Sequence, residues 1–286
     1  MEIAYDLGVN AAAAVLGAAG VAAWSAVRRR RTHRHQRAFW RFLDEPTTFV
    51  VGALDSEVLL NTLDVRLSSL IESDSARREV VATIVDHIRT QELSGLIGRG
   101  DFEALIRIIV GLALMEKPVS PVILAPEEVG HRRRGNLVLI GSADVNRLTA
   151  SLAPQMGCRL SVSTNSSGRN VVRDAEHGTE YSASDPGATT VLDYGVIARG
   201  RNPNNPASTV LVLAGAHGLG TQAAADVSLS DSDEENVHDL FSRHERGFEC
   251  LVRYKGSRLG HVDHSSGSSL VLGRALRPAR AVQSAS

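Results

Sequence analysis

A glycine-rich loop that contains a histidine is the segment best suited to chemistry. It has the sequence Gly215-Ala216-His217-Gly218-Leu219-Gly220-Thr221 and follows the apolar residues 209–214. Glycines let a backbone turn tightly and approach a ligand closely, and the free N–H groups at the start of a following helix attract an anion. His217 can exchange a proton near neutral pH. The loop therefore predicts an anion site at Gly215, Gly218, Gly220 and Thr221, with His217 as the candidate catalytic residue.

The spacing of the glycines narrows the kinds of ligand. A dinucleotide fingerprint needs the order G-x-G-x-x-G, which this loop does not have. The interval from Gly215 to Gly220, followed by Thr221, matches a phosphate-binding P-loop, but the lysine that reaches the phosphates is missing. Hydrolysis of a nucleoside triphosphate is therefore disfavoured. A tight strand-to-helix connection without a ligand stays an alternative.

Four further polar residues would line the mouth of this site if the strands that carry them are neighbours. Asn146 and Thr149 follow the apolar residues 136–141 and would offer an amide and a hydroxyl group. Asp193 and Tyr194 would offer a carboxylate and a phenol. The alternatives are a helix start for the first pair and a structural turn for the second.

A second glycine-rich segment, residues 95–100, also precedes a helix at residues 102–115. Its next residue, Asp101, would repel an anion, so we expect Asp101 to cap that helix.

Several classes of site are disfavoured by what the chain lacks. The sequence contains no G-x-S-x-G, H-E-x-x-H or Cys-x-x-Cys motif. Two cysteines, Cys158 and Cys250, cannot build a disulfide scaffold and make a cysteine zinc site unexpected. The run His261-Val262-Asp263-His264 has no further ligands nearby in the sequence and is interpreted as a polar loop. We predict no metal site, and no cofactor is indicated.

Apolar runs alternate with helical patterns along residues 46–255, which predicts an α/β domain. Fully apolar runs are typical of strands in parallel sheets, so we expect a three-layer, Rossmann-like, mostly parallel sheet. Ligands bind such sheets at the carboxyl ends of the strands, where the loops after Gly52, Gly141 and Ala214 would lie. Residues 256–286 are rich in serine, glycine and arginine and predict a flexible tail.

The N-terminal region predicts a membrane anchor. Residues 8–27 carry no charge, and twenty residues of helix, about 30 Å, match the hydrocarbon core of a bilayer. Arg28-Arg29-Arg30-Arg31 follow directly, whereas Glu2 and Asp6 precede. The positive-inside rule then places the N-terminus outside and the domain in the cytoplasm, as a single-pass cell-membrane protein. A cleaved signal peptide and a buried helix stay alternatives.

Aromatic and basic residues alternate just after this segment. Phe39, Trp40 and Phe42 are interleaved with Arg37 and Arg41, a pattern typical of a juxtamembrane helix on an anionic lipid surface. An ordinary amphipathic connector is the alternative. The expected organisation is therefore an anchor with a juxtamembrane helix at residues 1–45, then the domain and the tail.

The charge of the chain is unevenly distributed. The 286 residues include 31 Lys and Arg and 32 Asp and Glu, for a net charge of −1, which argues against a nucleic-acid binder. Seven of the arginines lie within residues 28–41, and without them 24 basic residues face 32 acidic ones. An anion bound by the body of the protein must therefore rely on local N–H groups and a few side chains.

Five segments together resemble a group of uncharacterised bacterial proteins, many of them actinobacterial, with Rossmann-like domains and an N-terminal membrane anchor. These segments are Gly98-Arg99-Gly100-Asp101, residues 135–141 with Asn146 and Thr149, Asp193-Tyr194-Gly195, Asn202-Pro203-Asn204-Asn205-Pro206, and residues 213–221. The resemblance covers residues 46–255 and implies a place beside signalling or conflict modules, without assigning a catalytic residue.

These patterns predict a membrane-anchored cytoplasmic domain that binds a nucleotide-like or other phosphorylated small molecule. A second form of this hypothesis is that the domain also processes that molecule. The alternative is a non-enzymatic scaffold or sensor that binds a protein partner at the membrane.

Overall fold

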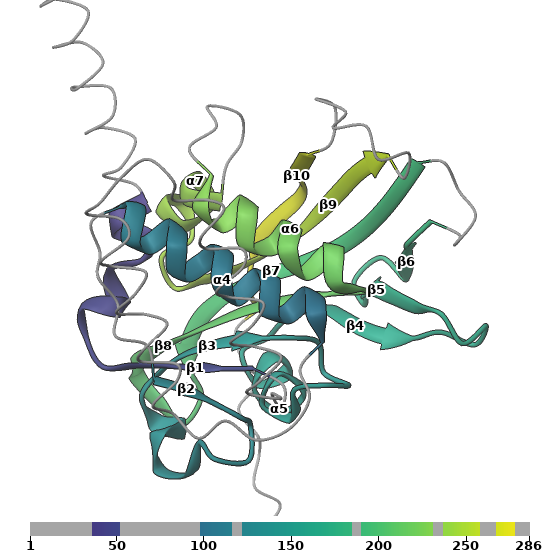
Figure 1. Cartoon of the computed structure of the whole chain (residues 1–286). Helices are drawn as coiled ribbons and strands as arrows, with labels where there is room; N and C mark the ends of the chain where they lie inside the picture. Colours follow the sequence, from purple (N-terminus) through teal and green to yellow (C-terminus); the bar gives the residue numbers. More distant parts are fainter. Residues whose placement is uncertain are drawn as a thin grey trace, which may run out of the picture.

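A seven-stranded sheet forms the centre of the structure (Figure 1). The computed structural model describes residues 36–51, 98–115, 122–184, 190–230, 237–257 and 267–277. The strands of the central sheet are β1 (Thr47–Val50), β2 (Val122–Leu124), β3 (Asn136–Ile140), β7 (Thr190–Asn202), β8 (Asn205–Gly215), β9 (Gly247–Ser257) and β10 (Gly267–Ala275).

The sheet has a parallel half and an antiparallel half. Its strand order is β10-β9-β7-β8-β3-β1-β2. The pairs β1–β2, β1–β3 and β3–β8 are parallel, whereas β7–β8, β7–β9 and β9–β10 are antiparallel. A two-residue turn, Pro203-Asn204, joins β7 to β8. The prediction of a mostly parallel sheet is therefore wrong, because an apolar run reports that both faces of a strand are buried and not the direction of its neighbour.

The other part of that fold prediction, a transmembrane helix at residues 8–27, concerns a segment outside the described residues. Among the helices that the structure describes, none is long and apolar enough to span a membrane. The predicted fold is thus corrected to a mixed α/β sheet without a transmembrane helix in the described part of the chain.

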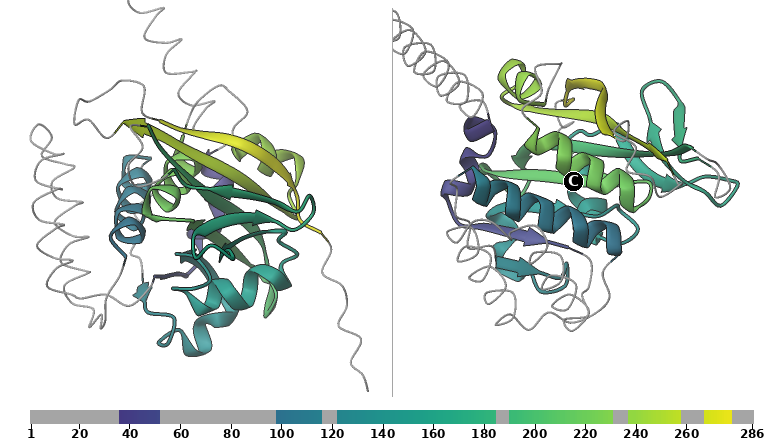
Figure 2. Two further views of the ribbon diagram at one scale, coloured as in Figure 1. Left: turned by 90° about the vertical axis from the view of Figure 1, so that its right-hand side faces the viewer. Right: turned by 45° about the horizontal axis from the view of Figure 1, so that its top comes forward.

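Helices cover one face of the sheet, and a helix with a small sheet covers the other (Figure 1, Figure 2). The first face packs against α4 (Arg99–Leu114), α6 (Gly218–Leu229) and α7 (Val237–Arg243). The second face packs against α5 (Arg147–Gln155) and the antiparallel sheet of β4 (Leu160–Thr164), β5 (Asn170–Asp174) and β6 (Thr179–Ser182). Two short 3-10 helices, η1 (Arg41–Asp44) and η2 (Gly130–Arg134), precede β1 and β3.

The aromatic residues before β1 belong to the core of the domain. Phe39 and Trp40 are 0% exposed and Phe42 is 8% exposed. The indole N–H of Trp40 donates to the carbonyl of Ser228 at 3.2 Å. The predicted juxtamembrane helix on a lipid surface is therefore corrected. The alternation of aromatic and basic residues arises because one side of this segment packs into the protein and the other faces solvent.

One arginine of β7 contacts two aromatic rings of this segment and one of α7. The guanidinium of Arg199 lies 5.6 Å from the centre of the Phe39 ring, 5.4 Å from Phe42 and 4.2 Å from Phe241. Such cation–π contacts stabilise a charge in the absence of a carboxylate. Burial still lowers the pKa of Arg199 to about 10. The segment before β1 is thus bound to the sheet by charge as well as by apolar contact.

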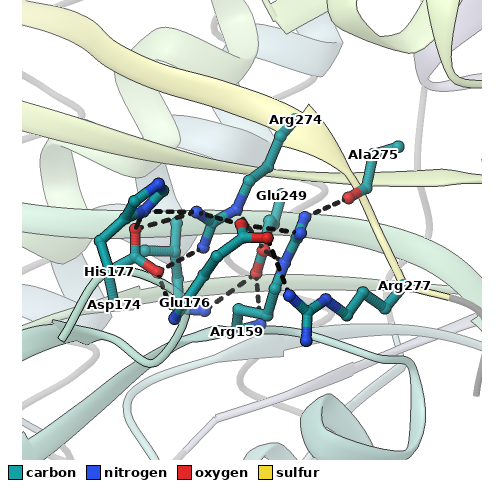
Figure 3. A network of polar contacts seen from close by, with 9 residues as sticks. Arg159, Asp174, Glu176, His177, Glu249, Arg274, Ala275 and Arg277 are labelled. Atoms are coloured by element: carbon teal, nitrogen blue, oxygen red, sulfur yellow. Dashed lines mark hydrogen bonds and ion pairs between the residues drawn. The ribbon is translucent and has the colours of Figure 1, made fainter.

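A network of charged residues joins β9 and β10 of the central sheet to the small sheet (Figure 3). Arg274 in β10 donates to both carboxylate oxygens of Asp174, at 2.9 and 2.8 Å, and to Glu249 at 2.8 Å. Arg159 donates to Glu249 at 2.8 Å through its side chain and again at 2.8 Å through its backbone N–H. Both carboxylates are 0% exposed, and hydrogen bonds from Arg274 hold the pKa of Asp174 well below its usual range.

The strand β10 also corrects the prediction of a flexible tail from residue 256. Gly267–Ala275 pairs with β9 along its length. Serine, glycine and arginine indicated disorder, but here glycine permits close packing and Arg274 neutralises two buried carboxylates. Residues 258–266 and 278–286 lie outside the described part of the chain.

Replacing Trp40 tests whether the segment before β1 is part of the core. We expect Trp40→Ala to lower the free energy of unfolding by about 3–5 kcal/mol, because a fully buried indole is lost. The control is Arg41→Ala, which removes a neighbouring exposed side chain and should change stability by less than about 0.5 kcal/mol. Urea unfolding measures both values. Equal stability of the two variants would show that the segment is not packed.

Replacing Arg274 tests the charged network. We expect Arg274→Met to lower the free energy of unfolding at pH 7 by about 3 kcal/mol or more, because it removes the bidentate partner of the buried Asp174 and one of the partners of the buried Glu249. Arg253→Met, at an exposed position of β9, is the matched control. The low pKa of Asp174 stabilises the folded state above about pH 4, and this stabilisation is lost as the pH falls. The difference between wild type and Arg274→Met should therefore narrow below pH 4, and a gap that stays constant with pH would contradict this account.

Candidate functional site

Contacts between main chains explain two glycines of the Gly215–Thr221 loop. The helix α6 begins at Gly218, with His217 as its N-cap residue. A Cβ atom on Gly100 of α4 would lie 2.0 Å from the Cα of Gly218. A Cβ atom on Gly220 would lie 2.2 Å from the carbonyl oxygen of Tyr194 in β7. The start of α6 is therefore held against α4 on one side and β7 on the other, at distances that only glycine permits.

An internal carboxylate occupies the start of α6. Asp193 is 2% exposed, and its Oδ2 accepts a hydrogen bond from the N–H of Gly220 at 2.6 Å. Its Oδ1 accepts from the N–H of Tyr194 at 2.8 Å. Burial raises the pKa of Asp193, although these N–H groups and the nearby His217 favour the charged form. Asp193 thus supplies the negative charge that the helix start attracts.

Asn146 and Thr149 stabilise the edge of the sheet from within. Asn146 is 0% exposed, and its amide donates to the carbonyls of Val50 and Ile140, both at 3.1 Å. Its side-chain oxygen also accepts from the N–H of Thr149 at 3.4 Å, which makes Asn146 the N-cap of α5. The hydroxyl of Thr149 donates to the carbonyl of Gly141 at 3.1 Å. Both side chains therefore connect the ends of β1 and β3 to α5.

The side chain of Tyr194 packs against β6 rather than against the glycine loop. It is half-buried, and its ring lies 5.5 Å from that of Tyr181 in β6. Of the four rim residues, Asp193 is the one whose side chain reaches the glycine loop.

Asp101, which the sequence assigned only to capping, lies where three elements meet. The N-cap of α4 is Gly98, so Asp101 stands in the first turn. The hydroxyl of Thr221 in α6 donates to its carboxylate. A Cβ atom on Gly141, directly after β3, would lie 2.9 Å from its Oδ2. The side chain is 8% exposed, and burial raises its pKa to about 6.

Two exposed polar residues, Asp144 and His217, lie on the segments next to this buried carboxyl. Asp144, in the turn after β3, is exposed, and its charge further raises the pKa of Asp101. Ser142 donates a hydrogen bond to Asp144. His217 is exposed at the start of α6, beside Gly218, whose backbone contacts Gly100 of α4, and its charge acts on Asp193. We name the group of Asp101, Asp144, His217 and Thr221 the carboxyl-edge site. It combines a carboxyl group that titrates near neutral pH, an imidazole and a hydroxyl.

The sequence carried a signal for Asp101. The segment Gly98-Arg99-Gly100-Asp101 has the small residues that let a helix start approach a neighbouring backbone. The expectation that Asp101 caps the following helix considers that helix alone, whereas the carboxyl is buried between the starts of two helices and the end of a strand.

The described residues offer no metal site and no reactive cysteine. They contain no group of three or more His, Cys, Asp and Glu able to hold a metal ion; residues 261–264 are not among them. Burial raises the pKa of both Cys158 and Cys250, which keeps them as thiols. A cavity of about 70 Å³ beside Thr149 and Cys158 is apolar and too small for a metabolite.

Comparison with models of known protein families gives no match, and comparison with curated proteins gives none either. The function therefore has to be argued from the chemistry of the site.

The pH dependence of stability tests the environment of Asp101. Its pKa of about 6 lies above the usual 3.8, so the folded state holds the proton more tightly than the unfolded chain. The resulting stabilisation is complete below about pH 4 and is lost as the pH rises through 6. We expect Asp101→Asn, which carries no charge, to match wild type near pH 4 and to exceed it by about 2 kcal/mol at pH 8.

Guanidinium unfolding of wild type and Asp101→Asn at several pH values measures this difference. Glu245→Gln, at an exposed position of the turn between α7 and β9, is a control that should give a small difference at every pH. A difference for Asp101→Asn that does not change between pH 4 and pH 8 would mean that the carboxyl is not buried as described.

Proposed function

We propose that the carboxyl-edge site binds a nucleotide-like, phosphorylated small molecule and that Asp101 exchanges a proton with it. The observation that carries this proposal is the burial of Asp101, with a pKa of about 6, between the starts of α4 and α6. A carboxyl group in such a place reduces stability at neutral pH, and groups of this kind cluster at functional sites. A pKa near the working pH suits a general acid or base.

The arrangement separates two parts of such a ligand. Carboxylates accept hydrogen bonds from sugar hydroxyls, and Asp101 and Asp144 supply them at the end of β3. A phosphate would face His217 and the N–H groups at the start of α6, because the body of the protein carries an excess of negative charge and offers no general attraction. Asp193 already uses the N–H of Gly220, so the phosphate would be held by His217 and the exposed side of the first turn.

Calorimetric titration with adenosine, AMP, ADP, ATP and NAD tests this proposal. We expect a nucleotide to bind with a Kd below about 1 mM, and adenosine to bind at least tenfold more weakly than its phosphorylated form. Asp101→Asn and His217→Ala should each weaken nucleotide binding at least tenfold. Affinity should rise between pH 5 and pH 7, because Asp101 must lose its proton to accept from a sugar hydroxyl.

A histidine outside the site provides the matched control. His131→Ala, at an exposed position of η2, should bind like wild type. If no nucleotide binds to a protein that melts cooperatively, or if Asp101→Asn binds as well as wild type, the proposal is wrong. The first outcome would favour the alternative of a scaffold that binds a protein partner.

A further inference from the structure

A large cleft lies at the opposite edge of the central sheet from the carboxyl-edge site. It has a volume of about 780 Å³, within the range of pockets that bind small molecules. Its walls come from the turn between β7 and β8, the end of α5, the turn between α7 and β9, and the residues that end β10. These elements meet where β8 and β9 begin, whereas the carboxyl-edge site lies where β3 and β8 end.

Basic side chains surround this cleft. It is lined by Arg201, Arg243, His244, Arg246 and Arg277, against one carboxylate, Glu245. Arg201 and Arg246 are exposed and form no ion pair within the part of the chain that the structure describes. Arg277 is paired with Glu176 at 2.8 Å, so Arg201 and Arg246 carry the positive charge that is open to a ligand. Such unpaired charge is unexpected in a body where acidic residues outnumber basic ones. Positive charges that line a concave surface concentrate an anion there.

Apolar residues also line the cleft. Met156, Pro203, Pro206 and Leu276 contribute to its lining, and Met156 is 7% exposed. An inorganic phosphate would use only the basic side chains. The combination instead suits a ligand with an anionic group and an apolar or aromatic body.

Hydrogen bonds hold the walls in place without a ligand. The N–H of Leu276 donates to the carbonyl of Gly247 at 3.1 Å, and that of Arg277 to Gly157 at 3.3 Å. Opposite them, the side chain of Asn202, which is 0% exposed, donates to two carbonyls of the segment before β3, each at 2.8 Å. A cleft that is already formed loses little entropy when a ligand binds.

We infer that this cleft is a second ligand site, which binds an organic anion of nucleotide size, with its charged group at Arg201 and Arg246 and its apolar body on Met156 and Leu276. The inference goes beyond the proposed function and does not depend on it, because the two sites share no residue.

Fluorescence titration of the full chain with 8-anilinonaphthalene-1-sulfonate tests the inference. This probe has an aromatic body and a sulfonate but no sugar hydroxyls, so the carboxylates of the carboxyl-edge site do not select it. We expect saturable binding of one probe per chain. Arg201→Glu and Arg246→Glu should each weaken it at least fivefold, and sodium chloride should weaken binding to wild type.

Two variants separate this site from general charge effects and from the proposed function. Arg253→Glu makes the same charge change on β9, at an exposed position six residues from Gly247, which starts that strand. It should alter affinity less than twofold, as should Asp101→Asn. If Arg201→Glu or Arg246→Glu lowers the melting temperature of the protein, the neutral variants Arg201→Gln and Arg246→Gln are used instead. These variants should weaken probe binding at least threefold.

Three results would overturn the inference. They are the absence of saturable binding by wild type, an equal loss of affinity in Arg253→Glu, and unchanged affinity in the Arg201 and Arg246 variants. A failure of nucleotide binding at the carboxyl edge would leave these expectations as they are.

Discussion

The contact between the backbones of α4 and α6 determines the geometry of the carboxyl edge. Gly100 and Gly218 approach so closely that neither position has room for a side chain. This contact brings two helix starts to the end of β3, and the carboxyl of Asp101 is buried between them. Without the contact, water would reach Asp101 and its pKa would return to an ordinary value. The close packing of the two glycines is therefore what gives Asp101 its raised pKa.

Electrostatic balance differs between the two edges of the sheet. At the carboxyl edge, Asp193 neutralises the start of α6 from inside the protein, and Asp101 and Asp144 add further acidic groups. At the other edge, four arginines line a cleft, and two of them, Arg201 and Arg246, form no ion pair within the described residues. Although the net charge of the chain is near zero, acidic groups gather at the carboxyl ends of the strands and basic groups gather at the cleft on the opposite side. Ligands with hydroxyl groups suit the first edge, and anionic ligands suit the second.

Segments near the two ends of the described chain stabilise the central sheet. Phe39, Trp40 and Phe42 fill the helical face of the sheet, and Arg274 joins β10 to carboxylates from β5 and β9. Both contributions come from regions whose composition suggested an anchor segment or a tail. An amphipathic or polar sequence pattern shows which residues can face water. It does not show whether the apolar residues pack against the protein or against a membrane.

The α/β class, the strands β1, β3 and β8 and the helix after the glycine loop follow from the sequence alone, because local burial and backbone preferences depend on short stretches of residues. The sequence also identified residues that matter to the edge of the sheet, although Asn146 and Thr149 serve there as structural hydrogen-bond partners. Four features depend on the tertiary structure: half of the sheet is antiparallel, Asp193 accepts a hydrogen bond from Gly220 in α6, Asp101 is buried, and five basic residues line one cleft. Each of these depends on residues far apart in the chain, and neither pairing direction nor desolvation follows from the order of residues along one segment.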